Sequence, residues 1–154
     1  MSSIADNIRS VTRRIQKATK AAGRADGSVS LLAVSKTKPA KDLREAAVAG
    51  QRAFGENYLK EALEKIDALA DLPDVEWHFI GPIQSNKTRA IAEHFQWVHS
   101  VDRLKVARRL SEQRPDHLPP LNLCLQVNVD EEDSKSGCRL EELPDLAAAI
   151  SGLP

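Results

Sequence analysis

The sequence predicts an α/β fold built on a parallel sheet, and three observations support this prediction. Short apolar segments alternate with longer segments of helical periodicity along the 154 residues, as in βαβ units. No glycine-rich phosphate fingerprint follows the first apolar segment, which disfavours a doubly wound dinucleotide-binding sheet. Polar residues gather where the strands are expected to end, which is where the chemistry of β/α barrels lies. Of the two architectures that right-handed crossovers allow, we therefore expect the barrel.

The first element is expected to be an amphipathic helix near the N-terminus. Its apolar residues recur at helical spacing, at Ile4, Ile8, Val11 and Ile15. Ser2 or Ser3 can cap this helix, and Gly23 can end it. A mitochondrial transit peptide is the alternative, because the stretch is basic and amphipathic. Asp6 lies within it, which favours a structural helix.

Five strands and five further helices follow in alternation. Apolar and β-branched runs predict strands at 30–35, 51–55, 75–80, 97–101 and 121–129. Helical patterns, bounded by proline or glycine in several places, predict helices at 40–50, 56–72, 87–95, 102–113 and 140–150. The helix at 56–72 is expected to bury a face that carries Leu59, Leu63, Ile66 and Leu69.

The number of these units bears on the size of the fold. A (β/α)8 barrel has eight strand–helix units and typically about 250 residues, whereas this sequence supplies about five units in 154 residues. We therefore predict one domain over residues 1–154, a TIM-barrel type fold of which only about the first five βα units are present. An open parallel sheet of this kind would leave bare edges, so the C-terminal part of a barrel is expected to be absent.

Composition excludes several classes of function. Basic and acidic residues are equal in number, 22 of each, so the chain has no overall positive charge for binding nucleic acid. No apolar run has the length of a membrane span. Two cysteines are too few for a disulfide scaffold and fit a reducing cytoplasm. Cys124 is expected to be buried and Cys138 to lie in an exposed loop. The four histidines show no metal-ligand spacing, so no metal is expected.

Lys36 is the candidate nucleophile. It ends the first predicted strand and shares a face with Leu32 and Val34. If these two residues point into a barrel core, Lys36 rises from that core at the catalytic end. Partial desolvation there would favour the neutral amine, which forms Schiff bases with aldehydes and ketones. An ordinary surface lysine that closes a strand is the alternative from position alone.

Several motifs occur in order at the predicted strand ends. They are AVSKTKP (33–39), FGENY (54–58), WHFIGPIQSNK (77–87) and SVD (100–102), followed by VNV (127–129) with Glu132, Lys135 and Gly137. Together they closely resemble the pyridoxal phosphate homeostasis protein family. The resemblance covers essentially the whole chain. The combination is specific, although any one of these short motifs alone would be weak.

The resemblance implies a barrel like the N-terminal domain of alanine racemase, with pyridoxal 5′-phosphate held as a Schiff base on Lys36. It further implies a role in the homeostasis of this vitamin B6 cofactor, with effects on amino-acid metabolism and without robust catalysis. Apoenzymes that depend on the cofactor are the candidate recipients. In the family, a Ser/Gly-rich segment near the last strands holds the phosphate. These 154 residues lack that segment, so we expect weak binding of the cofactor.

Further residues are expected to line the cofactor site, namely Asn57, His78, Ser100 and Asn128. Asn57 could hydrogen-bond the cofactor or cap the next helix. His78 could line the barrel interior, although a satisfied core histidine is the favoured reading. Either His99 or Ser100 must face inward, and the sequence does not decide between them. Asn128 ends the fifth strand and is the weaker candidate.

A pyridoxal-phosphate-dependent amino-acid racemase is the alternative function. Racemisation needs a base on each face of the substrate. By resemblance, alanine racemases supply the second base as a tyrosine from a separate β domain. Here Tyr58 is the only tyrosine and opens a predicted helix. We therefore expect a carrier without robust catalysis, and a simple interaction domain with a structural Lys36 remains a third reading.

Overall fold

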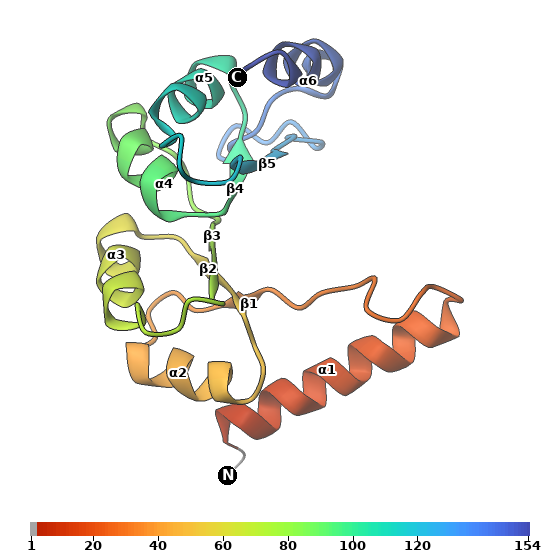
Figure 1. The fold of residues 1–154 in the computed structure, drawn as a ribbon. Helices are drawn as coiled ribbons and strands as arrows, with labels where there is room; N and C mark the ends of the chain where they lie inside the picture. The colour runs from red at the N-terminus through yellow and green to blue at the C-terminus, as the bar shows by residue number, and fades with distance from the viewer. Residues whose placement is uncertain (1–2) are drawn as a thin grey trace.

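The computed structural model describes residues 3–154, and a five-stranded parallel sheet forms its centre (Figure 1). The strands are β1 (Ala33–Val34), β2 (Ala53–Glu56), β3 (Glu76–Phe79), β4 (Trp97–Val101) and β5 (Asn122–Leu125). The helices are α1 (Ile4–Ala21), α2 (Ala40–Val48), α3 (Leu59–Ala68), α4 (Thr88–His94), α5 (Leu104–Gln113) and α6 (Leu143–Ser151). Two short 3₁₀ helices, η1 (Ser85–Lys87) and η2 (Leu140–Glu142), complete the elements. The predicted alternation is confirmed.

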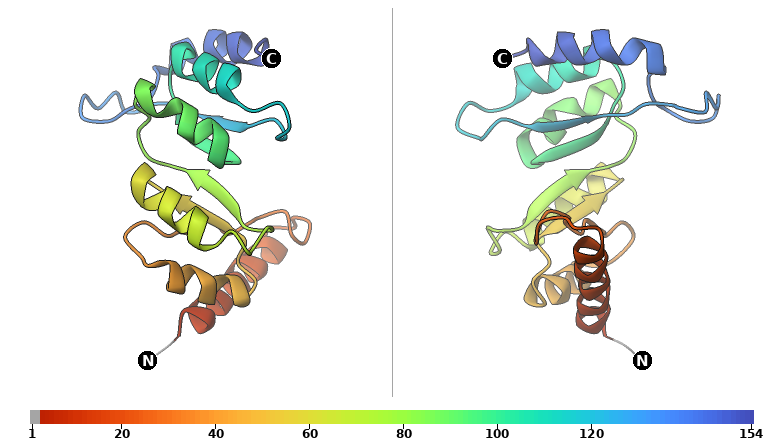
Figure 2. Two further views of the ribbon diagram at one scale, coloured as in Figure 1. Left: turned by 60° about the vertical axis from the view of Figure 1, so that its left-hand side comes forward. Right: turned by 90° about the vertical axis from the view of Figure 1, so that its right-hand side faces the viewer.

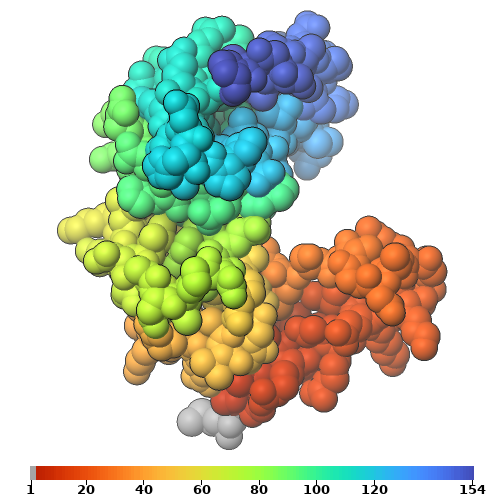
Figure 3. Space-filling view, in the orientation of Figure 1, coloured from red at the N-terminus to blue at the C-terminus, as the bar shows by residue number. Residues whose placement is uncertain are grey.

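The order of the strands distinguishes the two expected architectures. The strands pair consecutively, β1-β2-β3-β4-β5, and every pairing is parallel. Helices α2 to α5 cover one face of this sheet, while the opposite face is concave (Figures 1 and 2). A doubly wound sheet would reverse its strand order and carry helices on both faces. The arrangement is instead the wall of a β/α barrel, and Figure 3 shows the hollow on its inner side.

The hydrophobic core lies between the sheet and the helices. Phe54 pairs in register with Trp77, and Phe79 pairs with Val98. All four side chains are buried and point toward the helical layer, where Phe79 meets Phe95 edge to face at 5.3 Å between ring centroids. Full burial of a side chain of this size contributes roughly 1.5–3 kcal/mol. These contacts fix which face of each strand turns toward the helices.

Helix α1 begins and ends as its sequence predicts. The Ser3 hydroxyl accepts a hydrogen bond from the Asp6 amide at 3.1 Å, and the Asp6 carboxylate accepts one from the Ser3 amide, which completes a capping box. Gly23 follows the helix with φ +68°, a conformation that glycine adopts readily. Ser2, the other expected cap, lies outside the described residues.

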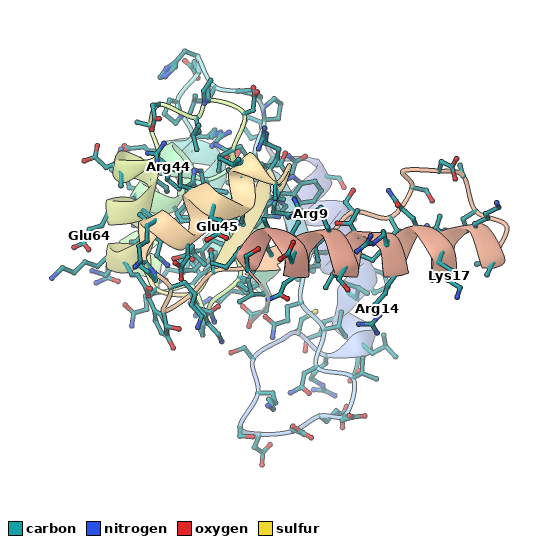
Figure 4. All side chains as sticks on the ribbon, turned by 90° about the horizontal axis from the view of Figure 1, so that it is seen from below. Arg9, Arg14, Lys17, Arg44, Glu45 and Glu64 are labelled. Atoms are coloured by element: carbon teal, nitrogen blue, oxygen red, sulfur yellow. The ribbon has the colours of Figure 1, made fainter. Side chains whose placement is uncertain are left out.

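Helix α1 packs on the rest of the fold through its first turns, and Thr19 near its other end is buried as well. Ile4 and Ile8 are partly buried against the core, and α1 contacts α2. Figure 4 shows Arg9, Arg14 and Lys17 along this helix, and all three are exposed. Over residues 3–154, no helix combines the length and the apolar character that crossing a membrane requires.

Three elements are markedly shorter than predicted. The strand expected at 30–35 is regular only over β1, and the other two are shortened for identifiable reasons. The strand expected at 121–129 is regular only over β5, because the Gln126 amide donates to Val101 while the Gln126 carbonyl accepts from Cys138. The chain then pairs Val127 with Cys138 as an isolated bridge. The helix expected at 56–72 spans only α3, because Glu56 is the last residue of β2 and is completely buried there.

Candidate functional site

Lys36 lies just beyond the carboxyl end of β1. Val34 pairs in register with Gly55, and the Ser35 amide donates to the Gly55 carbonyl at 2.9 Å. A β-carbon at Gly55 would lie 3.6 Å from a methyl group of Leu32, so Leu32 lies beside the same face of β2 as Val34. Lys36 is the second residue after β1 and lies in a turn, while Asn57 directly follows the neighbouring strand β2. That Lys36 shares a face with Leu32 and Val34 stays a prediction, because the chain leaves the strand before Lys36.

The surroundings of Lys36 differ from those expected. Val34 is 55% exposed, and Lys36 is exposed as well. Because Val34 lines an open face rather than a closed core, the partial desolvation that we expected for Lys36 is not found. The side chain is open to solvent and to an approaching aldehyde.

A buried ion pair between Lys65 and Glu56 lies against Ser35, the residue before Lys36. The Lys65 ammonium lies 2.8 Å from Glu56 Oε1, and these side chains are 6% and 0% exposed. The same Nζ atom donates to the Ser35 carbonyl oxygen at 2.7 Å. The Ser35 hydroxyl donates to the Glu56 carboxylate. The carbonyl oxygen and the hydroxyl of Ser35 are thus both hydrogen-bonded to charged side chains.

The residue after Lys36 is held by a second carboxylate. The Thr37 amide donates to Glu61 Oε1 at 2.6 Å, and Lys65 Nζ lies 3.0 Å from the same oxygen. The hydrogen bond from Lys65 is the main reason that the pKa of Glu61 is lowered. Burial raises this pKa by a smaller amount, and the bond from the Thr37 amide lowers it again. Thr37 has φ +65°, an uncommon conformation for a β-branched residue.

Asn57 carries an acceptor without a donor. Its Oδ1 atom is buried and accepts no hydrogen bond within residues 3–154. The N-cap of α3 is Tyr58, without a side-chain capping bond, so the expected capping role of Asn57 is wrong. Asn57 also borders a cleft of about 680 Å³ between α3 and α4, which Tyr58 and Lys87 line as well. A buried acceptor of this kind calls for an explanation, and a bound donor is one.

His78 and His99 form a hydrogen-bonded pair on the concave face. Nδ1 of His78 lies 2.8 Å from Nε2 of His99, and Nε2 of His78 lies 2.7 Å from Glu76 Oε1. The His78 ring stacks on Trp97 with an interplanar angle of 3°. His78 is buried and both its nitrogens have partners, which agrees with the favoured reading of a satisfied histidine.

Burial lowers the pKa of His78, although the Glu76 carboxylate opposes this shift. Burial also lowers the pKa of His99, and a charge on His78 lowers it further. Both rings are therefore neutral near pH 7. If the Glu76 carboxylate accepts from Nε2–H of His78, then Nδ1 of His78 must accept from Nε2–H of His99. This network leaves Nδ1 of His99 as a lone-pair acceptor.

Ser100 and Asn128 are occupied by structural hydrogen bonds. The Ser100 hydroxyl donates to the Gly81 carbonyl oxygen, while His99 is the residue that joins His78. The side-chain NH2 of Asn128 donates to the Glu132 carbonyl oxygen at 2.8 Å, and Oδ1 of Asn128 accepts from the Glu132 backbone amide at 3.1 Å. These two bonds close the loop after β5. The side chains of Ser100 and Asn128 thus serve the loops at this end of the sheet, and any contact with a cofactor stays a prediction.

Neither cysteine has the environment expected for it. Cys138 is 6% exposed rather than exposed in a loop, because its amide bonds to Gln126 and draws it against β5. Burial raises the pKa of its thiol, and Glu142 raises it further. Cys124 is half-buried. Among the described residues, no group of three or more His, Cys, Asp or Glu is placed to hold a metal ion.

Sequence reasoning missed the charged residues Glu56, Glu61 and Lys65. The usable signal is the helical spacing of Ala62, Lys65 and Leu69, three and four residues apart, which puts Lys65 on one helix face with two apolar residues. The structure buries all three. A lysine on the buried face of a helix needs a buried partner. Glu56 at the end of the preceding strand is that partner.

Comparison with known proteins identifies relatives of this chain. Residues 2–154 match the alanine racemase N-terminal domain family. The chain is 70% identical over 154 residues to the pyridoxal phosphate homeostasis protein of Pseudomonas aeruginosa, covering all of this chain and 66% of that protein. It is 53% identical over 156 residues to the protein of the same name from Escherichia coli K12, covering 67% of it. The chain thus spans about two thirds of the length of these relatives.

Solved structures show the same fold. PipY of Synechococcus elongatus, with PLP bound, aligns with a TM-score of 0.76 and 40% identity, over 90% of this chain and 64% of that one. A protein from Bifidobacterium adolescentis aligns with a TM-score of 0.88 and 32% identity, over 97% of this chain and 64% of that one. Alanine racemase from Corynebacterium glutamicum is 19% identical, with a TM-score of 0.65 over 97% of this chain and 41% of that one, and shows likeness of fold alone.

Proposed function

Because the chain belongs to the alanine racemase N-terminal domain family, we propose that it binds pyridoxal 5′-phosphate and takes part in the homeostasis of this cofactor. Two relatives support the proposal by name, and PipY supports it by its bound PLP. The observation that carries it in this chain is the exposed side chain of Lys36 just beyond β1, beside the end of β2, where the buried Oδ1 atom of Asn57 accepts no hydrogen bond within residues 3–154.

The residues around Lys36 fit an aromatic aldehyde. Gly55 has no side chain, and Ile80 and Leu32 fill the space above it, at 3.1 Å and 3.6 Å from where a β-carbon would lie, so an apolar surface is available beside Val34 for the face of a cofactor ring. Asn57 Oδ1 can accept a hydrogen bond from a ring substituent. When bound, the cofactor supplies an electrophilic aldehyde carbon. The Lys36 amine forms a C–N bond to that carbon, and the aldehyde oxygen leaves as water, which yields the Schiff base.

The cofactor phosphate contributes little to binding in this proposal. The Ser/Gly-rich segment that the family resemblance assigns to the phosphate does not occur in these 154 residues. Backbone amides of such a segment would ordinarily hold the dianion. We therefore expect pyridoxal and pyridoxal 5′-phosphate to bind this chain with affinities within about tenfold of each other, since no dedicated phosphate contact favours the latter.

The chain acts as a carrier rather than a racemase in this proposal. A racemase needs a second base opposite the lysine. Tyr58 is 54% exposed beside the cleft between α3 and α4, a location that does not oppose Lys36 across the concave face. In the proposed role, the chain releases pyridoxal 5′-phosphate to cofactor-dependent apoenzymes in the cytoplasm. It has no nucleic acid or membrane partner in this proposal. Failure to exchange the α-hydrogen of amino acids in deuterated water supports the carrier, and sustained exchange supports the enzyme.

An absorbance titration with pyridoxal 5′-phosphate tests cofactor binding. The native chain, Lys36→Ala and Lys38→Ala are compared, because Lys38 is a nearby exposed lysine of the same segment. We expect a saturable imine band in the native chain and in Lys38→Ala, and its loss in Lys36→Ala. An equal band in all three proteins would contradict the assignment to Lys36.

A further inference from the structure

We propose that Glu56, Glu61 and Lys65 are positioning residues that fix the backbone on both sides of Lys36. The proposal rests on the proposed function, in which Lys36 is the reacting amine. It assigns the charged cluster behind β1 a role in presenting that amine. The cluster thereby determines how readily Lys36 reacts with an aldehyde.

The contacts hold Ser35 and Thr37 but leave the side chain between them exposed. Lys65 Nζ binds the Ser35 carbonyl at 2.7 Å, and the Ser35 hydroxyl donates to Glu56. Glu61 accepts from the Thr37 amide at 2.6 Å. Lys36 itself is exposed. Anchoring both neighbours removes backbone freedom that a reacting amine would otherwise have to lose.

The conformation of Thr37 is the clearest sign that this segment is constrained. A β-branched residue at φ +65° is unfavourable by itself. Such outliers persist only where the surroundings over-determine them, and they cluster at functional sites. Here the surroundings are the charged hydrogen bond to Glu61 and the turn in which the Lys38 amide donates to the Ser35 carbonyl at 3.2 Å.

The burial of the cluster points in the same direction. Glu56 is completely buried and Lys65 is 5% exposed. A buried ion pair is weak evidence for a stabilising role, because desolvation opposes the attraction and an apolar replacement often serves as well. A cluster that bonds the backbone on both sides of one residue does something that an apolar replacement cannot do. It specifies the position of Lys36.

Glu61 is the residue to change first, because its side chain is 29% exposed and its loss leaves the buried pair intact. Glu64→Ala is the matched control. Glu64 is a glutamate of the same helix, is exposed, and projects outward in Figure 4. Glu61→Gln is the conservative variant, since its amide oxygen can still accept from Thr37.

Two measurements on the full 154-residue chain separate positioning from general stability. The first is hydrogen exchange of the Thr37 amide by NMR without any ligand. The second is the rate at which pyridoxal forms a borohydride-reducible imine on Lys36. In Glu61→Ala we expect Thr37 to exchange about tenfold faster, because a bond to a charged acceptor is lost, and the imine to form several-fold more slowly. Glu61→Gln should lie close to the native protein, and Glu64→Ala should match it.

Native-like exchange of Thr37 in Glu61→Ala would overturn the proposal. An equal fall of the imine rate in Glu64→Ala would also overturn it, because the effect would then follow from charge or stability. If the native chain forms no imine on Lys36, the proposed function fails, and the exchange of Thr37 alone decides whether the cluster fixes this segment.

Discussion

Nδ1 of His78 and Nε2 of His99 lie 2.8 Å apart, so two histidines from neighbouring strands share one hydrogen bond on the concave face. A proton added at Nδ1 of His99 leaves this hydrogen bond intact, whereas a second proton, at Nδ1 of His78, would remove the acceptor and place two cations in contact. Because burial already disfavours charge on each ring, the pair is a neutral unit whose protonation opposes the folded state.

The stability of the fold should consequently fall in mildly acidic solution. The unfolded histidines titrate near pH 6.5, and the folded pKa values of His78 and His99 lie below their ordinary value. Between these values the unfolded chain binds more protons, so the free energy of unfolding decreases as the pH falls below about 6.5.

Urea unfolding at several pH values between 7.5 and 5.5 measures the slope of the free energy of unfolding against pH. In His99→Gln the slope should be smaller, whereas His117→Gln, at an exposed site, should keep it. An unchanged slope in His99→Gln would contradict this account.

Gly81 should not tolerate even the smallest side chain. A β-carbon there would lie 2.4 Å from the carbonyl oxygen of Asn57, which is a backbone atom and cannot rotate away. We expect Gly81→Ala to destabilise the fold by roughly 1–3 kcal/mol, as overpacking does. Gly152→Ala is the control, because its β-carbon would meet its nearest atom at 3.6 Å. Urea midpoints that shift equally in both variants would contradict the close approach of Gly81 to Asn57.

Asn57 should matter for the ligand rather than for folding. Its buried Oδ1 atom has no partner within residues 3–154, and removing an unsatisfied buried acceptor is close to neutral for stability or favourable. Asn57→Ala is therefore expected to unfold at a urea concentration at least as high as the native chain, yet to bind pyridoxal 5′-phosphate several-fold more weakly. A marked loss of stability with unchanged binding would show that Asn57 serves the fold alone.

The two thiols should react at different rates. Cys138 is 6% exposed, and burial raises the pKa of its thiol, so little reactive thiolate is available to a reagent. Cys124 is half-buried. We expect iodoacetamide to modify Cys138 roughly tenfold more slowly than Cys124 in the folded chain, and at a similar rate in urea. Faster modification of Cys138 in the folded chain would contradict its placement against β5.

Much of the fold follows from local sequence pattern. Alternating apolar runs predict the parallel sheet, and the capping box at Ser3 and Asp6 marks the start of α1. The limits of α3 and β5 could not be predicted, because they depend on contacts between distant residues. Glu56 remains in its strand through a pairing with Lys65 in the next helix. The chain after Leu125 turns toward Cys138, more than ten residues further on.

The site could be predicted only in part, because some of its contacts also join residues that are distant in the sequence. Strand alternation and the family motifs indicate Lys36 and Asn57, and the structure places both just beyond the carboxyl ends of the paired strands β1 and β2. The same alternation cannot show that the Ser100 hydroxyl is taken by the Gly81 carbonyl, or that Asn128 closes its own loop. Those bonds depend on loop geometry, which sequence spacing does not specify. The positions of Glu61 and Lys65 around Ser35 and Thr37 likewise emerge only when α3 packs behind β1.

The central claim is that Lys36 is the residue that captures the cofactor, and identifying the modified lysine tests it most directly. The native chain is equilibrated with pyridoxal 5′-phosphate, reduced with borohydride, digested and analysed by peptide mass spectrometry. We expect the reduced cofactor on the peptide that contains Lys36, at a stoichiometry that approaches one per chain as the concentration of pyridoxal 5′-phosphate rises. Modification distributed among exposed lysines such as Lys38 and Lys60, without preference for Lys36, would contradict the claim.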